Sequence, residues 1–272
     1  MKNALLTILI IFWRTLVLLP RNIQNMFSRL FGYVFLILPL KRNKFSKVNI
    51  DLCFPKLSKE EQNQIYKKNV ISFGDVVFST GIAWFWSDMR IRKNISYEIN
   101  GLEDLINYQK SNTGIILFFK HSLHLELDAR LLAMNVEIFG VERKHNSEKF
   151  QSLQRNGRLK SMKGVADRNS TLSFIRWLKK GKTVMYAPDQ DYGKDKSIRS
   201  TFFNLPASTI SAPLKIIEKT GCKTFFINTY FKKKKLIINL EETKFDQSST
   251  SSFTRDLNGY IESKIKLNPH EY

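Results

Sequence analysis

One stretch constrains the fold of this chain more than any other: the apolar run from Ile115 to Phe119 and the polar cluster that follows it. The run is rich in β-branched and aromatic residues, which is typical of a buried strand. From about Leu123 the apolar residues take up helical spacing, so the segment predicts a strand followed directly by a helix. Open α/β folds place reactive groups at the carboxyl ends of strands, and His121 stands at that point. We therefore predict that His121 is a catalytic base.

The remainder of the chain continues this alternation of strands and helices. Strands are expected at 96–100, 136–141, 183–187, 223–230 and 236–240, and helices at 58–86, 103–109, 147–160, 170–180, 211–220 and 253–266. This order predicts an α/β fold with a mostly parallel central sheet flanked by helices. Ser58 and Glu61 have the spacing of a capping box, and Gly181 and Gly221 are expected to end helices. We see no internal repeat or long linker, so residues 46–272 are expected to form one catalytic domain.

The N-terminal region, residues 1–45, differs from the rest in being strongly apolar. Ala4–Pro20 is 17 residues long, which only just reaches the minimum for a membrane span, and 30–40 is too short to cross alone. Basic residues follow the first run, which predicts that the rest of the chain lies on the cytoplasmic side. Arg14 would be costly in the middle of a bilayer, so both a spanning and an interfacial position stay open. We predict a retained membrane-anchoring helix, against the alternative of a buried helix in a soluble domain.

The formal net charge of +20 requires an acidic partner. The candidates are nucleic acid, an anionic membrane surface and a phosphorylated substrate. No nucleic-acid recognition motif accompanies the charge, and a nucleic-acid binder would leave the apolar N-terminus unexplained. The two cysteines provide neither a disulfide framework nor metal-ligand spacing. These observations favour a membrane-surface protein that faces the cytosol and binds no nucleic acid.

His121 and Glu126 form an H-x(4)-E arrangement. If His121 lies in the turn before the helix and Glu126 in its first turns, the carboxylate can accept a hydrogen bond from one imidazole nitrogen. The other nitrogen can then take a proton from an attacking hydroxyl, which is general-base acyl transfer. A rival pair is His124 and Asp128, which would share a helix face. Metal binding by this cluster is a weaker reading, because no further ligand is placed to complete a site, and ordinary polar residues at a strand end are the simplest alternative.

Two further groups of residues carry candidate chemistry. The loop 186–193 follows another apolar strand and contains Asp189 and Asp191, which can bind sugar hydroxyls, hold an arginine or merely form an Asx-type turn. The segment between the two strands is basic, and arginine suits phosphate and carboxylate groups. Its members are Arg143, Lys144, Arg155, Arg158, Lys160, Lys163 and Arg168. No G-x-S-x-G, P-loop or G-x-G-x-x-G motif occurs, so the serine hydrolase, P-loop and dinucleotide-binding classes lack support.

Taken together, these motifs resemble the bacterial lipid A biosynthesis acyltransferases, with the closest likeness to the lauroyl and palmitoleoyl members. The resemblance runs from about Asn49 to the C-terminus. It rests on the segments 49–55 (NIDLCFP), 80–86 (TGIAWFW), 121–130 (HSLHLELDAR), 157–161 (GRLKS) and 187–193 (APDQDYG).

The resemblance implies an inner-membrane enzyme with a cytoplasmic active site and no cofactor or metal. The donor would be an acyl–acyl carrier protein and the acceptor a Kdo-modified lipid A precursor, with anionic membrane lipid as a third partner. The histidine matched by His121 activates the free 3-hydroxyl of an acyl chain on the acceptor, and the acid matched by Glu126 supports it. Arg158 and Asp189 match functional positions, whereas Arg143, Arg168 and Asp191 are weaker candidates for binding the acceptor.

The sequence departs from the family pattern in two places. Ser79 stands where a glutamate is expected, and the sequence stops at Tyr272, where the family usually continues into a basic, aromatic tail. The chain is therefore expected to be either a shortened member or part of a longer one. Two other functions remain open at this point: a glycerolipid acyltransferase acting on lysophosphatidate, and a non-catalytic basic membrane-surface protein with the same fold.

Overall fold

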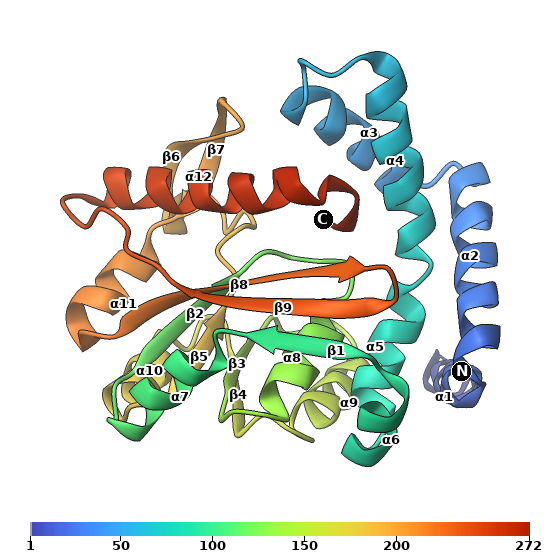
Figure 1. Ribbon diagram of the computed structural model, residues 1–272, viewed down its shortest axis with the longest axis horizontal. Helices are drawn as coiled ribbons and strands as arrows, with labels where there is room; N and C mark the ends of the chain where they lie inside the picture. The colour runs from blue at the N-terminus through green and yellow to red at the C-terminus, as the bar shows by residue number, and fades with distance from the viewer. Residues whose placement is uncertain (1) are drawn as a thin grey trace.

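The computed structural model describes residues 2–272, and its centre is a seven-stranded sheet (Figure 1). The strand order is β1-β9-β8-β2-β5-β3-β4. The strands are β1 Tyr97–Asn100, β2 Ile115–Phe119, β3 Phe139–Glu142, β4 Gly164–Asp167, β5 Thr183–Tyr186, β8 Lys223–Lys232 and β9 Lys235–Glu242. Only the β8–β9 pair is antiparallel, so the prediction of a mostly parallel sheet is confirmed.

Helices cover both faces of this sheet, and a separate hydrophobic core lies on each side. The first core packs α5 Val76–Phe85, α7 Leu102–Lys110 and α8 Leu125–Ala133 against the sheet. The second packs α10 Thr171–Lys179, α11 Ala212–Thr220 and α12 Thr250–Leu267 against the other face. The middle strand β2 contributes to both cores, because its successive side chains point to opposite faces. Its first four residues are all buried, as expected for a parallel strand covered on both sides.

Three helices precede this domain: α1 Lys2–Leu18, α2 Arg21–Ile37 and α3 Lys41–Cys53. In Figure 1, α1 and α2 lie on the right, where α1 packs on α5 and α2 on α4 Lys59–Phe73, and α3 lies at the top beside α4. Val17 is fully buried, and Trp13 donates a hydrogen bond to the Val77 carbonyl. Residue 45, the predicted boundary of the N-terminal region, falls within α3, and the division of the chain at that point stays a prediction.

The expected helix over 58–86 is broken in the structure. The Ser58–Glu61 capping box is confirmed at the start of α4, but α4 ends at Phe73 and α5 begins at Val76. A Cβ atom added to Gly74 would lie 2.1 Å from the Ser28 carbonyl oxygen of α2. Glycine at this break therefore allows α2 to approach more closely than any larger residue would.

Helix α3 and two β-structures are not predicted from the sequence. The short edge strand β4 carries little β-propensity, and the hairpin of β6 Ser197–Phe202 and β7 Leu205–Ile210 has no glycine in its turn. Phe203 and Asn204 make that turn with φ values of 50° and 61°, a conformation usually signalled by Gly or Asn at both positions. The hairpin stands apart from the main sheet and packs on α12.

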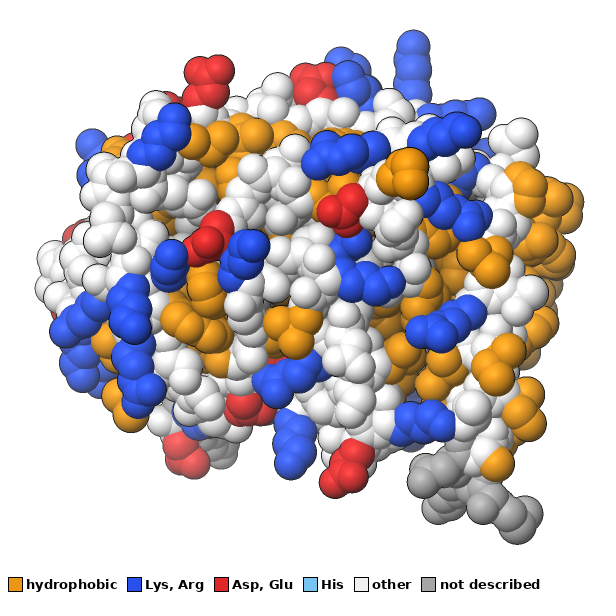
Figure 2. All heavy atoms as spheres, turned by 90° about the horizontal axis from the view of Figure 1, so that it is seen from below, with side chains coloured by type: hydrophobic (Ala, Val, Ile, Leu, Met, Phe, Trp, Pro, Cys, Tyr) orange, Lys and Arg blue, Asp and Glu red, His pale blue; other side chains and the backbone are white. Residues whose placement is uncertain are grey.

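No single helix among residues 2–272 is both long and apolar enough to cross a membrane. Helices α2 and α3 pass the length and composition criteria only as a pair, and they are bent by 82° relative to each other. Most of the large hydrophobic side chains that are exposed lie between Leu5 and Leu52. We call this set of side chains the apolar edge, and hydrophobic side chains gather on the right of Figure 2, the side on which α1 and α2 lie. The membrane-anchoring role of this region stays a prediction.

Candidate active site

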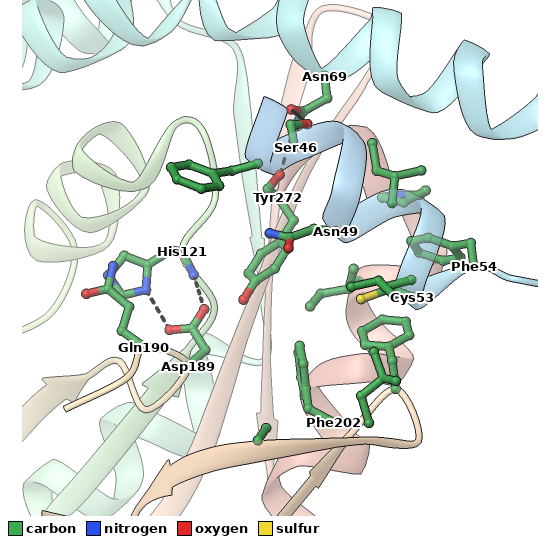
Figure 3. Close-up of a pocket in the computed structure, with 18 of the residues that line it drawn as sticks. Ser46, Asn49, Cys53, Phe54, Asn69, His121, Asp189, Gln190, Phe202 and Tyr272 are labelled. Carbon is green, nitrogen blue, oxygen red and sulfur yellow. Dashed lines mark hydrogen bonds and ion pairs between the residues drawn. The ribbon is translucent and has the colours of Figure 1, made fainter. Parts of the chain in front are cut away.

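His121 and Asp189 meet at the carboxyl edge of the sheet. His121 follows β2 and Asp189 follows β5, and these two strands are parallel neighbours, so their ends lie side by side. The Asp189 carboxylate accepts a hydrogen bond from the His121 backbone N–H at 2.7 Å, and its other oxygen lies 2.5 Å from His121 Nδ1 (Figure 3). The Asp189 side chain is fully buried, whereas 33% of the His121 side chain is exposed. Asp189 thus fixes both the backbone and the ring of the histidine.

This contact determines which imidazole nitrogen is available for chemistry. A carboxylate beside Nδ1 stabilises the tautomer that carries its proton there, which leaves a free lone pair on Nε2. Among the described residues, no protein atom hydrogen-bonds to His121 Nε2. Tyr272 also points toward Asp189 (Figure 3), and burial and that carboxylate raise the pKa of Tyr272 well above its usual range. The phenol therefore stays protonated beside the aspartate.

A pocket of about 600 Å³ opens next to this pair. Its walls come from α3, the β6–β7 hairpin and the end of α12, and they are mainly apolar, including Leu52, Phe54, Phe202 and Leu205. His121 and Asp189 lie on one side of the pocket and Phe202 on another (Figure 3). An apolar cavity with one reactive polar pair on its wall has the character of a binding site for a hydrocarbon chain.

The predicted hydrogen bond between Glu126 and His121 is wrong. Glu126 instead accepts hydrogen bonds from Arg158 Nη2 at 2.5 Å, Arg158 Nε at 3.1 Å and Trp84 Nε1 at 2.8 Å. His121 lies in the turn Lys120–His124, which precedes α8, whereas Glu126 lies in the first turn of α8. The side chain of Glu126 is directed toward α5 and α9 Glu148–Arg158. Burial opposes ionisation of Glu126, but Arg158 and Trp84 outweigh it and hold the pKa of Glu126 below its ordinary value. A functional role for Glu126 stays a prediction, and it would act through Arg158 and Trp84.

Close packing holds this largely buried ion pair together, in which each side chain is 15% exposed. A Cβ on Gly157 would lie 2.5 Å from the Trp84 ring, so glycine lets α9 rest directly on the indole. The segments 80–86, 121–130 and 157–161, which carried the family resemblance, therefore converge on one cluster behind the turn that carries His121.

The rival pair His124 and Asp128 is present as a buried network. His124 Nδ1 lies 2.6 Å from an Asp128 oxygen, and Ser122 and Thr229 donate hydrogen bonds to the other oxygen at 2.7 Å. Glu271 lies 3.4 Å from His124 Nε2, and its carbonyl accepts a hydrogen bond from the Leu123 backbone N–H. This network fixes the turn that carries His121, and it leaves no free imidazole nitrogen on His124 for catalysis.

The charge on His124 gives a testable pH dependence. Although burial disfavours the charged form, Asp128 and Glu271 raise the pKa of His124 to about 9 from an ordinary value of 6.5. Its stabilising contribution is therefore complete below about pH 6.5 and is lost as the pH rises through about 9. We expect the free energy of unfolding in urea to fall across this range in the wild type and to fall less in His124→Gln. Parallel curves for the two proteins would contradict the assignment.

The other predicted site residues are distributed along the same edge of the sheet. Arg143 follows β3 and is exposed, whereas Arg168 follows β4 and lies over the Tyr192 ring at 5.3 Å. Asp191 accepts a hydrogen bond from the Gly193 backbone N–H, which is the Asx-type turn considered above. The structure therefore brings together His121 and Asp189, and separately Glu126 and Arg158. Within residues 2–272, no group of three His, Cys, Asp or Glu side chains is arranged to hold a metal ion.

Comparison with known proteins shows which family the chain belongs to. The sequence model described as "Bacterial lipid A biosynthesis acyltransferase" matches residues 1–272. The chain belongs to this family. A lipid A biosynthesis acyltransferase of Haemophilus influenzae is 36% identical over 71% of this chain and 62% of its own length. The lipid A biosynthesis palmitoleoyltransferase of Escherichia coli is 29% identical over 85% of this chain and 76% of its own length.

The lipid A biosynthesis lauroyltransferase of Escherichia coli is 37% identical over 68% of this chain and 56% of its own length. The match with this relative and with the Haemophilus influenzae protein therefore spans less than two thirds of either one. The family resemblance inferred from the motifs is confirmed.

Proposed function

We propose that this protein transfers a fatty acyl chain from an acyl–acyl carrier protein to the 3-hydroxyl of an acyl chain on a Kdo-modified lipid A precursor. The observation that carries the proposal is the His121–Asp189 pair, set on the wall of an apolar pocket with Nε2 free. Membership of the family supports an acyltransferase with a lipid A-type acceptor.

In this reaction His121 Nε2 takes the proton from the acceptor hydroxyl as its oxygen attacks the thioester carbonyl. The tetrahedral intermediate then collapses, the carbon–sulfur bond breaks, and the imidazolium returns its proton to the leaving thiolate. Asp189 orients the ring and stabilises the positive charge that forms on it. The substrate supplies the nucleophile, so no covalent enzyme intermediate is needed.

The pocket provides a place for the hydrocarbon part of a substrate. Burial of each methylene group stabilises binding by about 0.8 kcal/mol, so a fatty acyl chain in the pocket contributes several kcal/mol. Its walls come from three separate segments of the chain, and their side chains would set the chain length that fits.

The apolar edge between Leu5 and Leu52 supports membrane association of the N-terminal region. A soluble monomer rarely leaves so many large hydrophobic side chains in contact with water. We infer that residues 1–45 anchor the protein to the bacterial inner membrane and that residues 46–272 face the cytoplasm, where the carrier protein is. The basic residues that follow the first apolar run agree with this orientation.

The net charge of +20 suits the three proposed partners, which are all acidic: the carrier protein, the acceptor and anionic membrane lipid. Arg143, Arg168 and Asp191 lie at the same sheet edge as His121 and remain candidates for binding the acceptor. The two arginines would pair with its phosphate or carboxylate oxygens, and Asp191 would accept hydrogen bonds from its sugar hydroxyls.

An acyl-transfer assay on the detergent-solubilised full chain tests the proposal. Lauroyl, myristoyl and palmitoleoyl carrier proteins would be offered with Kdo-modified lipid A precursor, and separately with lysophosphatidate. We expect transfer to the lipid A precursor with a preferred donor, and a loss of at least about 10²-fold in His121→Ala, because general-base catalysis contributes that much or more.

Two results would contradict the proposal. Transfer to lysophosphatidate alone would make the protein a glycerolipid acyltransferase. No transfer to either acceptor, from a sample that unfolds cooperatively, would make it a membrane-surface protein without this activity. As a control, His145→Ala replaces a histidine that pairs with Gln154 outside the pocket, and it should retain activity.

A further inference from the structure

A second pocket, also of about 600 Å³, lies on the other side of the C-terminal segment from the first. Pro269 and Tyr272 line the pocket beside His121, whereas His270 and Glu271 line this one. Its other walls come from α2, the α4–α5 break, the residues between α6 Asp88–Asn94 and β1, and the β8–β9 turn. The proposed acyl transfer makes no use of it.

The rim of this second pocket is positively charged. Arg29 comes from α2, and Lys233 and Lys234 form the β8–β9 turn, more than 200 residues later in the chain. Among the described residues, none of these three cations has a carboxylate partner or a hydrogen bond. An anion entering the pocket would therefore meet cations that are not already neutralised.

The acidic groups of the pocket are already engaged. Glu271 accepts hydrogen bonds from the Phe231 backbone N–H and pairs with His124. Asp75 is partly buried and lies opposite Arg21 and Ser28. Because these carboxylates face positive or donor groups on the pocket floor, they do not cancel the charge of the rim.

Hydrophobic surface lies next to these cations. On α2, Met26 is 58% exposed, Leu30 52% and Tyr33 54%, and they stand on the same helix as Arg29. A free inorganic anion would leave this surface in water. A ligand that joins an anionic group to hydrocarbon chains would satisfy the cations and cover the apolar face together.

We propose that the second pocket binds the phosphate group of an anionic phospholipid, with its acyl chains lying along the exposed face of α2. The phospholipid is not the substrate, because the pocket is separated from His121 by the C-terminal segment. It does, however, share Leu123 and His124 with the turn that carries His121. The proposal deepens the membrane association proposed above by naming one lipid class and its binding site.

The test is calorimetric titration of the full chain with dihexanoyl phosphatidic acid, a soluble lipid that needs neither a bilayer nor turnover. We expect saturable binding to the wild type and at least a tenfold weaker Kd in the double variant Lys233→Gln/Lys234→Gln, because two cations that face the phosphate group are lost. The matched control is Lys179→Gln/Lys180→Gln, a second exposed lysine pair outside the pocket, which should bind like the wild type.

Further arms identify the ligand and separate this proposal from the catalytic one. Dihexanoyl phosphatidylcholine should bind much more weakly, and His121→Ala should bind phosphatidic acid normally even if it is inactive. Equal weakening in the two lysine pairs would indicate general charge attraction and overturn the proposal. So would wild-type binding of inorganic phosphate as tight as that of the lipid, or a failure of the wild type to bind phosphatidic acid at all.

Discussion

Replacing Asp189 with asparagine is expected to lower kcat by about 10³–10⁴-fold while leaving the fold intact. The amide is the same size as the carboxylate, but it can present its oxygen to only one of the two N–H groups that Asp189 now accepts from, the His121 backbone and Nδ1. It also could not stabilise the imidazolium that would form in the proposed transfer. The measurement is kcat and KM for acyl transfer, together with the unfolding midpoint of the same preparation.

Glu126→Gln is the matched comparison, because it makes the same carboxylate-to-amide change on the acid that the sequence pairs with His121. Its loss of kcat should be smaller than that of Asp189→Asn, since Glu126 contacts Arg158 and Trp84 rather than the imidazole. The reverse ranking, with Glu126→Gln the more damaging, would mean that the catalytic state uses a different partner for His121 from the one in this structure.

Replacing Arg158 with methionine is expected to destabilise the protein by about 3–5 kcal/mol. The change removes the cation but leaves Glu126 with only 15% of its side chain exposed, and a largely buried carboxylate without its cation carries a large cost of desolvation. The free energy of unfolding in urea measures this loss. A second change, Glu126→Gln in the same chain, should recover a large part of it, because the remaining amide is uncharged.

The comparison variant for this cycle is Arg176→Met. Arg176 is an exposed arginine on α10 for which the structure shows no ion pair among the described residues, so its loss should change stability by less than about 0.5 kcal/mol. If Arg158→Met behaved like Arg176→Met, the Glu126–Arg158 pair would not be the buried, structural contact described above. If the double variant were no more stable than Arg158→Met, the destabilisation would arise from lost packing rather than from the charge.

Much of the fold could be predicted because it depends on local patterns. The strand Ile115–Phe119 is found with its predicted bounds, since a continuous apolar run between turns has few alternatives. The helix ends at Gly181 and Gly221 hold, because both glycines adopt positive φ. The break between α4 and α5 was not predictable, because it depends on how closely α2 approaches Gly74.

For the candidate site, the sequence identifies single residues but not which of them lie close together. The sequence identified His121 and Asp189 as separate candidates, but nothing local says that β5 lies next to β2. Without knowledge of the strand order, the sequence predicts the acid nearest in the chain, Glu126, as the partner of the histidine. Tyr272 carried no signal at all, because it reaches Asp189 from the far end of the sequence.

The position of α3 affects how a lipid substrate would travel. Phe45 is 65% exposed on the apolar edge and also lines the pocket beside His121. Leu52, about two helical turns further along α3, lines the pocket too. The wall of the pocket is therefore continuous with the surface proposed to rest in the membrane. An acyl chain moving from the bilayer toward His121 along this helix would exchange one hydrocarbon environment for another. It would avoid the cost of about 0.8 kcal/mol per methylene that passage through water imposes. The proposed transfer would then take place laterally within the interface, without extraction of the acceptor into solution.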